Sequence, residues 1–250
     1  MTAPGDEEEP PPVRLQPGPV LLGTVGVLVA SRRQFAALAW PAALAVLLAA
    51  LVHVHAFGAV AAAGAAWVAV LPPLIVLAVA WHRVILLGVR PPKLRWRRRH
   101  TVYTGVALGV AALHVLLYAV FVVTIAGVPM HTGARLASLL VTLWFTITLF
   151  TPLTLKLPAC ATGLSLPDRA WQSRPAHFGN AALVWLGVVP PGAVLAGLAG
   201  LLIAPTGAPL AVHLAASVAG AALVPLAAVL PVTAVSLMFR ALRTAPGAGG

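Results

Sequence analysis

The chain has 250 residues, of which 60% are hydrophobic and only 8% are charged, and its mean hydropathy is +0.98. Soluble domains carry about 25% charged residues, so a water-soluble fold of this size could not cover its surface with so few charges. The net charge of +11 does not indicate nucleic acid, because the bases lie in short stretches beside apolar runs. The composition therefore predicts a chain surrounded mainly by lipid.

The N-terminal part precedes the first long apolar stretch. Residues 1–19 form an acidic, proline-rich tail with too little apolar sequence to fold alone. Residues 20–34 are expected to form a short interfacial or re-entrant helix, because their apolar run reaches only about half of a ~30 Å hydrocarbon core. Residues 35–240 are expected to form the transmembrane domain, and residues 241–250 a flexible tail.

The expected fold is all-α, a polytopic membrane helix bundle of about six transmembrane helices. Each span requires ~20 predominantly apolar residues. The stretches that meet this requirement are residues 35–56, 58–81, 102–126, 134–156, 179–203 and 209–239. The last stretch is long and interrupted by prolines, so its ends are the least defined.

The bases lie almost entirely on one side of these spans. Of the 16 Lys and Arg residues, Arg135 alone falls beside a loop of the other side. The positive-inside rule therefore predicts that both termini are cytoplasmic, and the Ala-, Val-, Gly- and Arg-rich composition favours the inner membrane of a bacterium. Residues 31–35 also match a twin-arginine export pattern. The long apolar run after them and the acidic start favour a topology signal instead.

The loop before the third expected span is strongly basic. It holds Arg95, Trp96, Arg97, Arg98, Arg99 and His100. Each base near an anionic leaflet contributes about 1 kcal/mol to binding, and a tryptophan is suited to the headgroup level. The loop either only sets the topology, which is the simpler interpretation, or it also binds anionic lipid or a protein partner.

Two expected spans carry a proline pair, Pro72-Pro73 in the second and Pro190-Pro191 in the fifth. Proline removes a backbone donor and crowds the carbonyl four residues back, and paired broken helices form midplane sites in several transporters. Kinked packing helices are the simpler interpretation. His114 is the one titratable group expected deep inside a span, where ionisable residues are often functional.

Most enzyme classes lack their required groups. Outside the N-terminal tail the sole carboxylate side chain is Asp168. Catalysis by a pair of carboxylates, or by two metal ions, therefore lacks the acidic residues it requires. His53 and His55 are two residues apart and point in different directions on a helix. Cys160 is the only cysteine, which excludes an internal disulfide. We therefore expect no catalytic residues, no metal and no cofactor.

Residues 81–88 read WHRVILLG and resemble the W-H-R-x-x-L-L-G-E signature at the end of the second span in uncharacterised bacterial membrane proteins of this length. Residues 157–163, LPACATG, with Ala170-Trp171, are similar to their LPA-x-A-x-G and AW segment. That family is distantly similar to the membrane domain found beside glycerophosphoryl diester phosphodiesterases. Val89 departs from the signature, which usually has Glu there. The resemblance implies the six-helix topology and no hydrolase activity, since the catalytic barrel is absent.

Trp81, His82 and Arg83 are expected where the second span leaves the membrane, with Trp81 in the interfacial belt and Arg83 snorkelling. This motif has either a structural role or a role in binding headgroups or a partner. The leading hypothesis is a non-enzymatic membrane protein whose basic cytoplasmic rim contacts anionic lipid, a protein partner or a second copy. The alternative is a small transporter or lipid carrier that uses the proline-broken spans.

Overall fold

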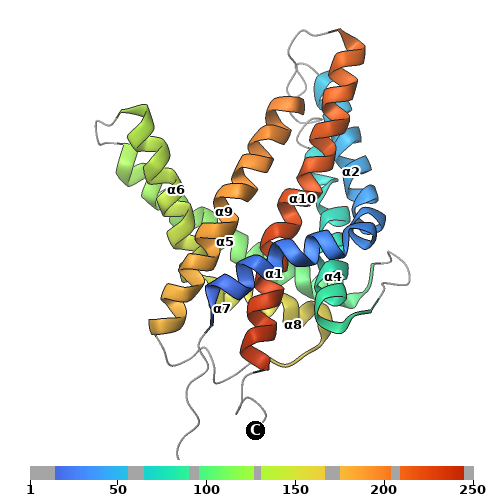
Figure 1. Cartoon of the computed structure of the whole chain (residues 1–250). Helices are drawn as coiled ribbons and strands as arrows, with labels where there is room; N and C mark the ends of the chain where they lie inside the picture. The colour runs from blue at the N-terminus through green and yellow to red at the C-terminus, as the bar shows by residue number, and fades with distance from the viewer. Residues whose placement is uncertain are drawn as a thin grey trace, which may run out of the picture.

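The structure is a computed structural model that describes residues 15–55, 65–89, 96–126, 131–166, 175–203 and 209–244. All regular structure in these residues is helical (Figure 1). Six helices are long and apolar enough to cross a bilayer, which confirms the expected all-α bundle. They are α2 (Arg32–His55), α4 (Leu71–Leu87), α5 (Arg98–Ala126), α6 (Thr132–Leu149), α9 (Pro175–Ile203) and α10 (Leu210–Arg243). The chain is therefore a multi-pass integral membrane protein.

A short helix, α1 (Pro17–Ala30), precedes the first span as expected. It begins with proline in its first turn and is capped at its end by Ser31, whose N–H bonds back to Val27 O, and α2 starts at the next residue. Figure 1 shows α1 crossing in front of α9 and α10. It fits closely there because Gly187 of α9 has no side chain, and a Cβ at that position would collide with Leu21.

Helix α10 is the centre of the bundle and packs against α1, α2, α4 and α9. Its fully buried apolar side chains are Val229, Ala234, Met238, Phe239 and Leu242. The expected proline interruption of the last span is wrong, because α10 continues through Pro225 and Pro231. A proline removes only one N–H from the ladder, and helices packed on the neighbouring turns hold the remainder in place.

The second span is shifted relative to the expected residues 58–81. It runs over Ala65–Leu87, with a turn at residues 69–70 from which α4 restarts. Pro72 and Pro73 lie in the first turn of α4, where no N–H donor is needed. Gly88 ends the helix in the left-handed conformation, with φ 63°, as expected for a helix-terminating glycine. The Trp81-His82-Arg83 motif consequently lies inside the helix.

The fourth span ends earlier than the expected residue 156. Helix α6 stops at Leu149 and is followed by two short helices, α7 (Thr151–Thr154) and α8 (Lys156–Thr162). Pro152 starts α7 within its first two positions, because its missing N–H is tolerated at a helix start but not in a helix interior. Helix α8 packs against α4 and α5, and its Ala161 lies in one buried cluster with Val79 and Tyr103 of those helices.

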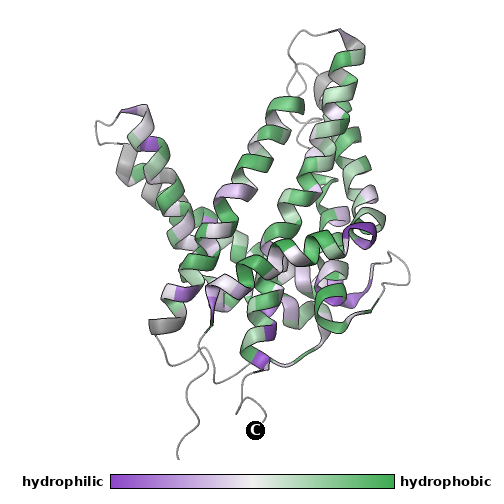
Figure 2. Cartoon of the chain, viewed as in Figure 1, coloured by the Kyte–Doolittle hydropathy of each residue, from purple (hydrophilic) through white to green (hydrophobic). Residues whose placement is uncertain are grey.

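The α5–α6 hairpin leans away from α9 and α10 in Figure 1. Its outer surface is apolar, with Val115, Leu116, Val123 and Leu136 exposed. Figure 2 shows hydrophobic residues along most of the length of the helices, with hydrophilic residues gathered mainly at their lower ends. Hydrocarbon is the solvent in which such a surface is stable.

Gly220 sets the distance between α9 and α10. A Cβ at this position would lie 3.0 Å from the carbonyl oxygen of Ala199 and 2.9 Å from Cγ1 of Ile203. We expect Gly220→Ala to lower the free energy of unfolding in detergent by about 1–3 kcal/mol, because a backbone oxygen cannot move aside.

Gly200→Ala is the matched control, because nothing lies within 4 Å of a Cβ at Gly200. The free energy of unfolding of this variant should equal or exceed that of the parent protein, since alanine is more favourable than glycine in a helix by about 1 kcal/mol. An SDS or thermal titration that gave both variants the same stability would contradict the close packing at Gly220.

Candidate functional site

The predicted site residues divide into an inward-facing set and a surface set. Trp81 and His82 are buried, with exposed fractions of 0% and 1%. Arg97 and Arg98 are exposed, Arg83 and Arg99 are half-buried, and Arg95 lies outside the described residues. The motif in α4 and the basic segment at the start of α5 therefore meet at one end of the bundle.

The inward-facing set forms a hydrogen-bonded network between three helices. Trp81 Nε1 donates to Thr233 Oγ1 of α10 at 2.8 Å. Nδ1 of His82 lies 2.7 Å from Ser236 Oγ of α10, and its Nε2 lies 3.3 Å from the Tyr103 hydroxyl of α5. All five side chains are buried, so the network joins α4, α5 and α10 away from solvent.

One proton arrangement satisfies every group around His82. The Ser236 hydroxyl donates to Val232 O of its own helix at 2.8 Å, so its oxygen is left to accept. Nδ1–H of a neutral His82 donates to that oxygen, and Nε2 accepts from the Tyr103 hydroxyl. A neutral, fully bonded imidazole is the form that a buried site favours.

Trp81 is buried inside the bundle and does not lie on its surface. The helix continues to Leu87, so Trp81 lies about 9 Å inside the helix end at 1.5 Å per residue. Its ring packs edge-on against Phe35 of α2, with 5.7 Å between ring centroids. The amphipathic indole serves here to cross-link helices, because its N–H finds a partner within the bundle.

The surface set is a cluster of arginines, Arg83, Arg97 and Arg99, which we call the arginine cluster. Arg97 and Arg99 lie close enough to Arg83 for their charges to repel its guanidinium. The positive charges of all three arginines also act on the imidazole of His100. His100 is held by its backbone neighbour, since the Arg97 N–H donates to its Nδ1 at 2.8 Å. The described residues contain no carboxylate side chain that could neutralise this charge.

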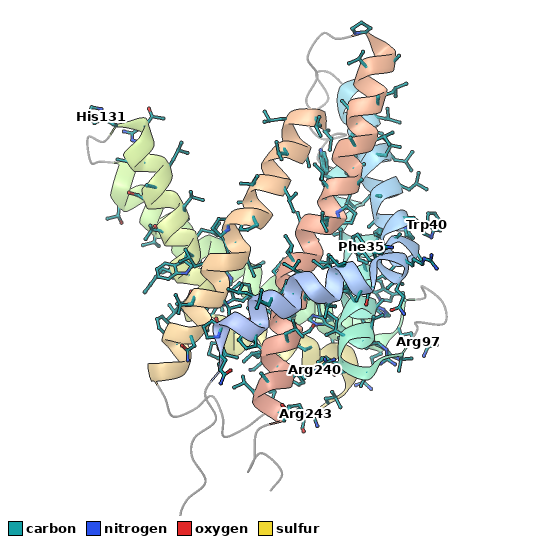
Figure 3. All side chains as sticks on the ribbon, viewed as in Figure 1. Phe35, Trp40, Arg97, His131, Arg240 and Arg243 are labelled. Atoms are coloured by element: carbon teal, nitrogen blue, oxygen red, sulfur yellow. The ribbon has the colours of Figure 1, made fainter. Side chains whose placement is uncertain are left out.

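Several of the arginines lie at the same end of the bundle. Figure 3 places Arg97, Arg240 and Arg243 toward the lower end of the bundle and His131 at the opposite end. Trp96 is 48% exposed beside the arginine cluster, and its ring lies 5.5 Å from that of His100. This end therefore combines several cations with an exposed indole.

The residues proposed for transport are placed differently from the expectation. Helix α9 is continuous through Pro190 and Pro191, and both prolines face outward, as does Pro72, while Pro73 is half-buried. His114 Nδ1–H donates to Val110 O at 2.6 Å, and its ring packs edge-on to Phe150. Its buried Nε2, the acceptor nitrogen of this tautomer, has no hydrogen-bond partner among the described residues.

Sequence reasoning missed Tyr103, Thr233 and Ser236 as members of the network. Thr233 and Ser236 are three residues apart and therefore share a face of α10, which is a usable signal. Their partners are 152 and 154 residues away in the chain, so no local pattern could identify the pairs.

The Ser236–His82 bond gives a testable stability difference. Ser236→Ala leaves the Nδ1–H of His82 buried without an acceptor, so we expect the free energy of unfolding in detergent to fall by about 1–2 kcal/mol. SDS titration of the purified protein measures this change.

Ser217→Ala is the control on the same helix, since the Ser217 side chain is fully buried and its hydroxyl has no hydrogen-bond partner in the described part of the chain. Its removal should leave the free energy of unfolding unchanged or slightly raised. Equal losses for the two variants would show that the bond to His82 contributes nothing.

No protein-family model, curated protein or solved structure matches this chain. The resemblance of residues 81–88 to the W-H-R signature therefore stays a prediction. Any function must be argued from the geometry of the arginine cluster and the network beside it.

Proposed function

We propose that this protein is a non-enzymatic component of a bacterial inner membrane whose cytoplasmic basic rim binds anionic lipid. The arginine cluster is the observation that supports this function most directly. Three guanidinium groups gather where α4 ends and α5 begins, and the described residues hold no carboxylate to pair with them. Arginines that repel one another without an internal counter-ion favour an external anion.

The neighbouring residues support a lipid anion as the partner. Arg83 lies within the span Ala65–Leu87 and Arg99 within the span that starts at Arg98. Both residues therefore lie near the ends of their spans. Their long side chains can extend so that the guanidinium groups reach the headgroup phosphates. Exposed Trp96 is suited to the same interfacial layer.

The proposed orientation has both termini in the cytoplasm. Arg97, Arg240 and Arg243 lie at one end of the bundle (Figure 3), and the positive-inside rule assigns such an end to the cytoplasmic face. The transporter alternative has weaker support. Pro190 and Pro191 face outward from a continuous helix, whereas a midplane site requires broken backbone that lines a cavity.

Lipid binding is tested with the full-length protein in vesicles of phosphatidylcholine that contain acyl-chain spin-labelled lipids. The parent protein should immobilise a larger share of labelled phosphatidylglycerol than of labelled phosphatidylcholine. Replacing Arg97, Arg98 and Arg99 together by Gln should reduce this preference by up to about 3 kcal/mol, at roughly 1 kcal/mol per base, and added salt should reduce it in the parent as well.

Arg135→Gln is the control, because Arg135 lies on helix α6 near its start at the opposite end and should not change the preference. Equal immobilisation of the anionic and the neutral lipid by the parent protein would refute the proposed function.

The orientation is tested by labelling single thiols in intact cells with a membrane-impermeant maleimide. Burial raises the pKa of the Cys160 thiol, which slows its reaction with maleimide. Replacing Cys160 by Ala removes the remaining labelling of the native thiol. In that variant, Thr244→Cys at the exposed C-terminal end of α10 should stay unlabelled until the cells are opened, and the exposed His131→Cys should react from outside. The reverse pattern would overturn the proposed orientation.

A further inference from the structure

The position of the arginine cluster is fixed by the buried network beside it. His82 contacts Tyr103, which joins the end of α4 to the first turns of α5. Arg83 follows His82 directly, and Arg99 lies one turn before Tyr103 on the same face of α5. The backbone therefore holds two guanidinium groups near each other at the same end of the bundle, and Arg97 adds a third.

The degree of burial makes this charge difficult to leave unpaired. Arg83 and Arg99 are half-buried, so water screens their repulsion less than at a fully exposed surface. His100 beside them is buried to 6% exposure and held by Arg97, so it adds a hydrogen-bonding group and no counter-charge. The strongest neutralisation comes from an anion with several oxygens and more than one charge.

We infer that the arginine cluster selects a lipid phosphomonoester over a lipid phosphodiester. This inference rests on the proposed binding of anionic lipid and names the headgroup class. A phosphomonoester carries roughly −1.5 to −2 charges near neutral pH and has three terminal oxygens, whereas a diester carries a single charge on two. Three terminal oxygens accept forked hydrogen bonds from more than one guanidinium.

An apolar side chain beside the cluster indicates a lipid rather than a free phosphate ester. Val102 is 47% exposed and follows Arg99 by three residues, so it lies on the same face of α5, one turn further into the span. Trp96 is also exposed, and its Nε1–H donates to Thr101 Oγ1 at 3.1 Å in the first turn of α5. A phosphate held at Arg99 would thus lie near both a hydrocarbon-facing side chain and an interfacial indole.

The test compares two anionic lipids in the same full-length protein. Acyl-chain spin-labelled phosphatidic acid and phosphatidylglycerol are added separately to phosphatidylcholine vesicles that contain the parent protein, and the immobilised fraction gives the relative association constant. We expect phosphatidic acid to associate roughly fivefold more strongly than phosphatidylglycerol, the effect of about one additional charge interaction.

A charge-matched pair of variants locates the selectivity. Arg83→Gln combined with Arg99→Gln should bring the ratio of the two constants close to one. Arg240→Gln combined with Arg243→Gln removes the same number of charges from the same end (Figure 3) and should leave the ratio unchanged. Equal loss in both double variants would overturn the assignment to the arginine cluster.

Two further outcomes separate this inference from the proposed function. If the parent protein prefers both anionic lipids over phosphatidylcholine equally, the lipid-binding function stands and the phosphomonoester selectivity fails. If an excess of glycerol 3-phosphate displaces phosphatidic acid from the protein, the site takes the free ester and the assignment to a lipid is overturned. We expect no displacement.

Discussion

The bundle depends on hydroxyl groups that donate a hydrogen bond within their own helix and accept one from a side chain of another helix. Thr233, Ser236 and Thr151 each donate to a carbonyl four residues earlier. Their oxygens then accept from Trp81, His82 and Trp185 of other helices. In hydrocarbon no water competes for these groups. A donor that finds such an acceptor is therefore satisfied only when the helices are correctly packed.

This constraint explains the positions of the aromatic donors Trp81, His82 and Trp185. The donors are indole and imidazole N–H groups on rings large enough to reach across a helix interface, and their apolar surfaces fill the space between backbones. Trp144 repeats the arrangement by donating to Ala182 O of α9 at 2.8 Å. The pattern ties α4 to α10, α6 to α9 and α9 to α7. Elsewhere the contacts rely on small residues such as Gly187 and Gly220, which let neighbouring chains approach closely.

The number of spans and the short helix α1 could be predicted from apolar length alone, because a bilayer sets a minimum length for any crossing segment. The ends of the second and fourth spans could not. Pro72 and Pro152 start helices there, whereas a proline inside an apolar run is equally compatible with a kink. The surface location of Arg97 and Arg98 was predictable from charge. The burial of Trp81 and His82 was not, because the same residues suit an interface until their partners on α10 are known.

Trp81, His82 and Arg83 are consecutive, so two groups that lock α4 to its neighbours are separated from an outward cation by a single peptide bond. Successive residues of a helix differ by about 100° in direction, and the locked pair leaves Arg83 little freedom to turn. A ligand held by Arg83 in the folded bundle would be lost when α4 separates from α10. The stability of the packed bundle would therefore depend on the headgroup composition of the surrounding bilayer as well as on the polypeptide. No conformational change of the folded protein would be needed for this dependence.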